Sequence, residues 1–524
     1  MTQAITQAPS LLIPLVPEAR EPLQEQIYRG LRDAILTGRL APGARLPSTR
    51  ALAGDLDVAR NTVVPVYEQL RAEGLIAGRA GGGTRVVAVL PDAFLRVHGP
   101  AGPRPGINGA NGNGRRVQVA APVNGGGAPH PGAAEARRPA RVSAAAAAVA
   151  RTEMGVWREG GPRTFRLGVP DHDAFPAELW GQLLARRWSQ SGRELLAAGD
   201  PRGYPPLREA IAQYVAAARA VRCTPDQVIV TGGAQPALSL AARALLDPGD
   251  TAWVEEPGYG AVKAAFLGVG ARLVPVPVGP GGIRVDEGMR RAPEARLACV
   301  TPSNQHPLGG AMDLPTRIAL LEWADRNDAW IVEDDYDSEF RYTGRPLPSL
   351  QGLDPSERVV YVGTFSKTIS PALRLGFMVV PPALVPIVSA LRSGTDRYPP
   401  ALEQAVLADF ISQGHFARHV RRMRAIYSQR VQLFRAIAAQ ELSGLLEVPP
   451  IEAGLRLLGW LPEGVSDLCV RDQAARRGVD VEPLSVHRTE PGGRGGLLLG
   501  FAGFNGHATR RGMQELAAAI RACM

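Results

Sequence analysis

Short apolar runs alternate with segments of helical length over residues 160–524. The runs are rich in β-branched and aromatic residues and are short enough for strands buried on both faces. The six clearest runs begin at Val228, Ala252, Leu297, Trp330, Val359 and Phe377. Stretches such as 236–246 and 315–327 separate them and are long enough for helices. This order predicts an α/β domain on a mainly parallel sheet.

A helical pattern occupies the N-terminal 90 residues instead. After a proline at position 22, apolar residues recur at four-residue steps from Leu23 to Ile35, and Gly38 follows as a stop signal. Ser48 is placed to cap a second, short helix, and a third follows a tight turn at 57–58. A glycine triplet at 81–83 then predicts a β-hairpin. Two short helices joined by a tight turn, with a hairpin after them, predict a winged helix-turn-helix.

Residues 97–150 show neither the helical nor the strand periodicity of hydrophobic residues, and Ala, Gly and Pro fill 32 of these 54 positions. Such a segment buries too little apolar surface to offset the entropy of ordering it. We therefore expect a flexible linker over 91–155, between a DNA-binding domain at 1–90 and a larger domain at 156–524.

The composition is that of a soluble protein, with 45% hydrophobic and 21% charged residues among 524. No secretory signal or membrane-spanning run is visible, so we expect a cytoplasmic protein without membrane contact. The four cysteines are widely spaced, which argues against a disulfide framework or a cysteine zinc site. Most of the formal charge of +9 lies in the linker, so charge alone does not predict DNA binding.

Only two lysines, Lys263 and Lys367, occur among 59 basic residues, so chemistry that needs an ε-amine has two candidates. Four loops follow predicted strands, where ligands bind in parallel sheets. They carry a glycine-rich turn at 231–236, an aromatic residue at Tyr259, an acidic run at 333–339, and the segment Thr364-Phe-Ser-Lys367 followed by Arg374.

Each loop has a chemical interpretation. Backbone N–H groups of the glycine-rich turn, two hydroxyls and Arg374 suit a phosphate dianion. Tyr259 is able to stack on a planar ring, and a carboxylate of the acidic run is able to hold a protonated ring nitrogen. A metal in the acidic run has little support because no histidine lies there. A desolvated Lys367 suits a Schiff base, and together these parts are those of a pyridoxal 5'-phosphate (PLP) site.

With these motifs in this order, residues 160–524 resemble a fold-type I aminotransferase, an α/β PLP-dependent transferase. Residues 18–90 resemble a GntR-type winged helix, through Pro42-Gly-Ala-Arg-Leu-Pro-Ser48 and Arg60-Asn-Thr-Val63. The whole chain therefore resembles the MocR/GabR family of transcriptional regulators.

The resemblance implies a role for each matching residue. Lys367 would form the Schiff base with PLP, Asp334 would pair with the pyridine nitrogen, and Tyr336 would bind the ring hydroxyl. Tyr259 would stack on the ring. The phosphate would be held by Gly233, Ala234, Thr364, Ser366 and Arg374.

Some positions stay open. Asn304, Gln305 or His306 would take the ring contact that an asparagine makes in aminotransferases. Three arginines are candidates for binding a substrate carboxylate: Arg456, Arg488 and Arg494. Lys263 follows no predicted strand and has no hydroxyl neighbours in the sequence, so we expect it on the surface.

The resemblance also implies DNA contacts. Arg45, Ser48, Arg50 and Thr62 would touch phosphates, and Arg60 would reach a base edge in the major groove. Because Pro65 is poorly tolerated inside a helix, we expect the recognition helix to start late, capped by Asn61 or Thr62.

Three functions are consistent with these residues. The favoured one is a PLP-dependent transcriptional regulator that binds an operator in double-stranded DNA, forms a homodimer and senses an amine, an amino acid or PLP itself. The alternatives are a working aminotransferase with a DNA-binding module, and a GntR regulator whose larger domain binds no PLP and serves only for dimerisation.

Overall fold

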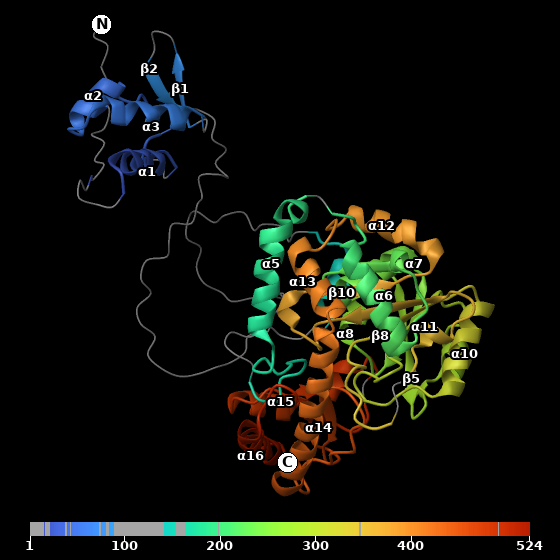
Figure 1. Ribbon diagram of the computed structural model, residues 1–524. Coiled ribbons are helices and arrows are strands. Elements are labelled where there is room, and N and C mark those ends of the chain that lie inside the picture. The colour runs from blue at the N-terminus through green and yellow to red at the C-terminus, as the bar shows by residue number, and fades with distance from the viewer. Residues whose placement is uncertain are drawn as a thin grey trace. The chain divides into compact units, whose positions relative to one another are not determined.

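The computed structural model describes residues 15, 21–36, 39–41, 43–72, 75–79, 83–87, 141–152, 163–197, 199–344, 347–490 and 492–524. The chain divides into two compact units, 1–118 and 119–524 (Figure 1). Gly38, the first two residues of the glycine triplet and residues 97–140 of the expected linker lie outside the described residues.

The N-terminal unit is the expected winged helix-turn-helix. Its elements in chain order are α1 (Leu23–Leu36), α2 (Thr49–Asp55), α3 (Arg60–Ala72), β1 (Ile76–Arg79) and β2 (Gly83–Val86). The Ser48 side chain caps α2 by accepting a hydrogen bond from the backbone N of Ala51 at 3.1 Å. Strands β1 and β2 pair antiparallel to form the wing. Apolar residues of all three helices, including Ile27, Leu52 and Leu70, form one buried core.

Helix α3 begins at Arg60, so the prediction of a later start capped by Asn61 or Thr62 is wrong. Pro65 is the sixth residue of this helix and stays inside it. A proline there removes one hydrogen bond of the helix. Val63, Val66 and Leu70 are nonetheless fully buried, and packing of this apolar face holds the helix in place.

The larger unit is built on an eight-stranded sheet, and all six predicted strands belong to it. Across the sheet the order is β3 (Val228–Thr231), β10 (Gly376–Val379), β9 (Val359–Thr364), β8 (Trp330–Asp335), β7 (Leu297–Val300), β4 (Thr251–Glu256), β5 (Arg272–Gly279) and β6 (Gly282–Ile283). Strands β4, β5, β7, β8 and β9 pair parallel, and β10 runs antiparallel to β3 and β9. The prediction of a mainly parallel α/β sheet is confirmed.

Helices pack around this sheet (Figure 1). They are α5 (Ala177–Leu195), α6 (Pro205–Arg219), α7 (Ala234–Leu245), α8 (Gly260–Gly268), α9 (Val285–Arg291), α10 (Leu314–Arg326), α11 (Leu350–Leu353), α12 (Val385–Ser393) and α13 (Ala401–Ser412). Short 3-10 turns are η1 (Pro225–Gln227), η2 (Pro371–Leu373) and η3 (Pro382–Leu384).

A smaller lobe closes the chain around a three-stranded sheet. Its strands are β11 (Arg456–Trp460), β13 (Gly496–Gly500) and β12 (Glu482–Pro483), and its other elements are α15 (Asp467–Arg476), η4 (Leu484–His487) and α16 (Gly506–Arg521). The 27-residue helix α14 (His415–Glu441) belongs to both lobes. Phe416 and Val420 lie in the core beside the large sheet, whereas Tyr427 and Phe434 lie in the core of the small lobe.

Two further observations differ from the sequence predictions. Residues 144–150, expected within the flexible linker, form helix α4 (Ala144–Ala150), which Ser143 caps and which packs against α8. Cys469 and Cys523 form one disulfide between α15 and the end of α16, which the argument against a disulfide framework did not anticipate. Their separation of 54 residues gave no signal, because the packing of α15 on α16 brings them together.

Candidate functional site

One edge of the large sheet collects the predicted site residues. Asp334 lies near the C-terminal end of β8 and Thr364 ends β9, while Thr231 ends β3. Because β10 is antiparallel, its first residue, Gly376, pairs with both Thr364 and Thr231. Arg374, which precedes β10, is thereby brought to the same edge.

Three of these segments place hydrogen-bond donors close to one another. An ideal Cβ at Gly233 would lie 3.5 Å from the Arg374 guanidinium, and one at Gly376 would lie 2.8 Å from the Gly233 backbone. Gly233 has φ of 113°, a conformation that favours glycine. It caps α7, whose N-terminal residue is Ala234, and the Thr364 and Ser366 hydroxyls lie 3.1 Å apart. Free N–H groups at a helix N-terminus, hydroxyls and a guanidinium attract a dianion.

Lys367 points at the backbone of Gly168. A Cβ at Gly168 would lie 2.5 Å from the lysine Nζ, and the φ of Gly168 is 72°, so this position favours glycine for two reasons. Burial lowers the pKa of Lys367 below its ordinary value, and Asp337 offsets part of that effect. Burial thus favours an uncharged amine, which is the nucleophilic form.

The Asp334 carboxyl is buried at this edge of the sheet, and one of its oxygens lacks a hydrogen-bond partner among the described residues. It is 3% exposed, and its Oδ1 has no hydrogen-bond partner among the described residues. Burial raises the pKa of Asp334 to about 7, with further contributions from Asp335 and Glu255, while Lys367 acts in the opposite direction. A cationic N–H donor from a ligand would satisfy this carboxyl.

Two tyrosines contact the loop that follows β7. The Tyr336 hydroxyl donates to the backbone O of Asn304 at 2.6 Å, and as an oxygen it is still able to accept. Tyr259 precedes α8 and is 41% exposed, with a ring edge-to-face on His306 at 5.1 Å. This exposed aromatic surface is available to a planar ligand.

Of the three candidate arginines, Arg456 alone belongs to this site. It lies 3.8 Å from Asp337 between Nη1 and Oδ2, and its Cζ lies 5.3 Å from the centre of the Tyr336 ring. Arg488 and Arg494 instead bind backbone carbonyls of the 492–494 turn and of Leu461, respectively.

In the loop after β7, two of the three candidate side chains already have hydrogen-bond partners. The Asn304 amide donates to both Asp337 oxygens at 2.9 and 3.0 Å, and the Gln305 amide donates to Glu255 at 3.1 Å. His306 is buried, and its Nε2 has no hydrogen-bond partner among the described residues. Burial, and then Arg456, lower the pKa of His306 well below its ordinary value.

Lys263 does not lie on the surface, so that prediction is wrong. Its side chain is 12% exposed, and its Nζ donates to the backbone O of His487 at 3.0 Å and to Thr489 Oγ1 at 2.7 Å. Both acceptors lie more than 220 residues away in the chain, so no local pattern revealed them.

The predicted DNA contacts gather on the N-terminal unit. Arg45, Arg50 and Arg60 are exposed, and none has a side-chain hydrogen bond or ion pair to a described residue. The Arg45 side chain runs beside Gly83 of the wing, where a Cβ would lie 3.0 Å from its Nε. Ser48 and Thr62 stand at or near the starts of α2 and α3. Guanidinium groups with no partner among the described residues, two of them in the first turns of α2 and α3, are suited to phosphates and base edges.

Sequence reasoning missed part of the site in the larger unit. Gly168 gave no signal because it is one glycine among 59 and lies far from Lys367 in the chain. Asp337 was included in the acidic run, but its pairing with Arg456 depends on the position of β11.

Comparison with known proteins agrees with both units. Residues 165–455 match the aminotransferase class I and II family, and residues 23–86 match the gntR family of bacterial regulatory proteins. Among the residues that the structure describes, no helix is long and apolar enough to cross a membrane.

Individual relatives and solved structures match between 69% and 96% of this chain. The probable rhizopine catabolism regulatory protein MocR of Rhizobium meliloti is 40% identical over 96% of this chain and 95% of its own length. The HTH-type transcriptional regulator TauR of Rhodobacter capsulatus is 35% identical over 79% of each chain. The structure of LysN, an α-aminoadipate aminotransferase of Thermus thermophilus complexed with N-(5'-phosphopyridoxyl)-L-leucine, is 28% identical, with a TM-score of 0.64 over 69% of this chain and 92% of that one.

Proposed function

The chain belongs to the MocR family of GntR-type DNA-binding transcriptional regulators, and from this premise we propose that its larger unit binds PLP and uses it to detect a small amine or amino acid, or PLP itself. The fold of that unit is an aminotransferase fold, which implies PLP binding. Acting on DNA, the protein would work in the cytoplasm.

The observation that carries this proposal is the buried Asp334 carboxyl at the sheet edge, whose Oδ1 has no hydrogen-bond partner in the described part of the chain. A protonated pyridine nitrogen would give it the missing donor and hold it ionised. Lys367 would anchor the coenzyme through its amine, at the position set by Gly168. When bound, the coenzyme would supply an aldehyde carbon that reacts with primary amines and a ring that withdraws electrons.

The remaining contacts divide by chemistry. Gly233 and Ala234 N–H groups, the Thr364 and Ser366 hydroxyls and the Arg374 guanidinium would hold the phosphate. Tyr259 would cover one face of the ring, and the Tyr336 hydroxyl would meet the ring hydroxyl.

An effector amine would compete with the Lys367 amine for the aldehyde carbon of the coenzyme, and the released lysine amine would remain beside Gly168. If the effector carries a carboxylate, Arg456 is the side chain to bind it, because it is the one candidate arginine that lies beside Tyr336. Asp337 already balances part of its charge, so a carboxylate must compete with that contact.

The output would be a change in DNA binding. Arg45, Ser48, Arg50 and Thr62 would hold phosphates of the operator and Arg60 would read a base edge. An effector changes this equilibrium only to the extent that it binds two conformations with different affinity. We propose that the regulator acts as a homodimer, with a linker long enough for the DNA-binding unit of one chain to reach its partner.

An absorption spectrum of the purified full chain with PLP tests the proposal. We expect a band near the edge of the visible range that is absent from Lys367→Ala. Lys263→Ala is the matched control, since it removes the other lysine and should keep the band. Equal bands in the protein and Lys367→Ala would refute the assignment of the anchoring lysine. No band at all would leave the regulator whose larger unit binds no PLP.

A catalytically active aminotransferase that carries the DNA-binding unit is the second candidate, favoured by the complete lysine, aspartate and arginine set. Steady release of keto acid from amino acids, at many turnovers per chain, would establish it. Amine-dependent changes in operator gel shifts without turnover support the regulator.

A further inference from the structure

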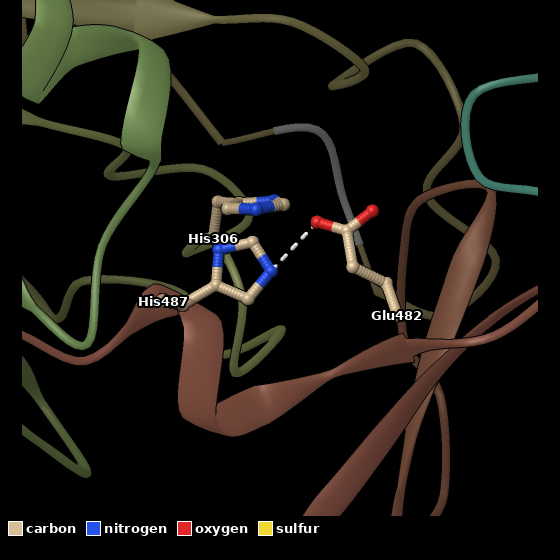
Figure 2. A group of neighbouring side chains, drawn as sticks. All are labelled: His306, Glu482 and His487. Carbon is tan, nitrogen blue, oxygen red and sulfur yellow. Dashed lines mark ion pairs between the residues drawn. The ribbon is translucent and has the colours of Figure 1, made fainter. Parts of the chain in front are cut away.

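Three side chains meet near Lys367 and take no part in the coenzyme contacts of the proposed function. They are His306 from the loop after β7, Glu482 from β12 and His487 from η4, and we name them the His–Glu–His cluster. One ligand atom from each lies within 4.8 Å of the others. Figure 2 shows the three side chains turned toward a shared space.

The cluster is not fully satisfied by its own contacts. His487 Nε2 lies 2.8 Å from Glu482 Oε1 (dashed line in Figure 2), in an orientation that makes an ion pair but not an aligned hydrogen bond. His306 is 9% exposed, and its Nε2 has no partner among the described residues. The two imidazole rings meet edge-to-face, with their centres 4.8 Å apart. A buried imidazole nitrogen is unfavourable without a partner, so this geometry points to a bound group.

The backbone around the cluster is fixed from outside. The carbonyl of His487 accepts hydrogen bonds from Lys263 Nζ at 3.0 Å and from the Gly258 backbone N at 3.1 Å. Lys263 is itself paired with Glu256 at 3.7 Å. These bonds set the position of His487, which gives the buried Lys263 a positioning role.

We propose that His306, Glu482 and His487 form a binding site for a divalent transition-metal ion such as Zn2+. Two imidazole nitrogens and one carboxylate oxygen are a common ligand set for zinc, with a fourth position left for water or a small molecule. Mg2+ and Ca2+ prefer oxygen ligands and are disfavoured here.

Geometry and charge are compatible with this ion. Bonds of about 2.0–2.1 Å to Zn2+ place tetrahedral ligand atoms roughly 3.3 Å apart, so modest side-chain rotations close the site. Glu482 supplies one negative charge. Two cationic side chains, Arg456 and Lys367, lie near His306. Arg456 is already paired with Asp337.

Metal content of the full chain tests the site. The purified protein is stripped with a chelator, dialysed against Zn2+, and measured by elemental analysis. We expect about one tightly held zinc per chain, lost in both His487→Ala and Glu482→Gln. His507→Ala removes an exposed histidine on α16 and should keep the zinc. Circular dichroism of each variant establishes that it is folded.

Replacement of zinc by Co2+ adds a readout of geometry. Intense visible bands, as expected for a tetrahedral Co2+ site, should appear in the protein and vanish in Glu482→Gln. Equal zinc content in the protein and both cluster variants, or far less than one zinc per chain in the unsubstituted protein, overturns the proposal. Because neither measurement uses PLP, its failure would leave the coenzyme proposal standing.

Discussion

Asp334→Asn should stabilise the coenzyme-free protein at alkaline pH while weakening its hold on PLP. Burial raises the pKa of Asp334 from 3.8 to about 7, so the folded protein without a partner for this carboxyl binds its proton more tightly than the unfolded chain does. Stability from this group is therefore fully present below pH about 4 and is lost as pH rises through about 7.

The size of this effect follows from the shift in pKa. One pKa unit corresponds to about 1.36 kcal/mol, so ionisation of Asp334 at pH 8 lowers the free energy of unfolding by up to about 4 kcal/mol. Asparagine keeps the shape and carries no charge, so Asp334→Asn should recover that amount at pH 8 and change little at pH 4. Loss of a hydrogen bond to a charged group should cost PLP binding about 1.5–3 kcal/mol, or roughly 10- to 150-fold in affinity.

Urea unfolding at pH 4 and pH 8, followed by tryptophan fluorescence, measures the first effect. All seven tryptophans lie beyond residue 156, so the signal reports on the larger unit alone. Glu463→Gln, at an exposed carboxylate, is the control and should show no pH-dependent gain. The reasoning would be refuted by an Asp334→Asn protein that is no more stable at pH 8, because Asp334 would then have an internal partner.

Three further predictions concern other parts of the chain. Arg60→Ala should cost about 1–3 kcal/mol of operator binding and reduce discrimination against random DNA in gel shifts; unchanged discrimination would count against base contact. Arg219→Met should destabilise the larger unit by about 3–5 kcal/mol, because it leaves Asp335, whose Oδ2 is 2.7 Å from Arg219 Nε, buried without its ion pair; a loss below 1 kcal/mol in urea unfolding would contradict this. Cys469→Ser should lower the stability of the small lobe by about 2–4 kcal/mol, since it opens a loop of 54 residues; alkylation of both thiols without reductant would show that no disulfide forms.

The sequence predicted those elements whose signals are local. The six predicted strands of the large sheet each contain a continuous apolar run, and the Ser48 cap is marked by its residue type and position. Strand β5 escaped because Pro275 and Pro277 lie within it. They are tolerated because β5 pairs with β4 on one side, while β6 pairs only with its last two residues on the other.

The site residues fall into the same two groups, those that local strand signals place and those that long-range packing places. Lys367 follows β9, Arg374 precedes β10 and Asp334 lies near the end of β8, so the sheet alone brings them together. The choice of Arg456 over two other arginines depends on where the small lobe packs, and the partners of Lys263 come from η4 and its end. Such long-range contacts leave no pattern in the chain.

Helix α14 gives the lysine loop a mechanical link to the far lobe. Near its start, His419 Nε2 lies 2.9 Å from the backbone O of Thr368, the residue after Lys367. Further along, the same rod is embedded in the core of the small lobe through Phe434 and Ile437. A displacement of the lysine backbone must therefore either break that hydrogen bond or tilt helix α14. Because the helix is long, a small tilt near His419 moves its far end, in the small lobe, by a larger distance.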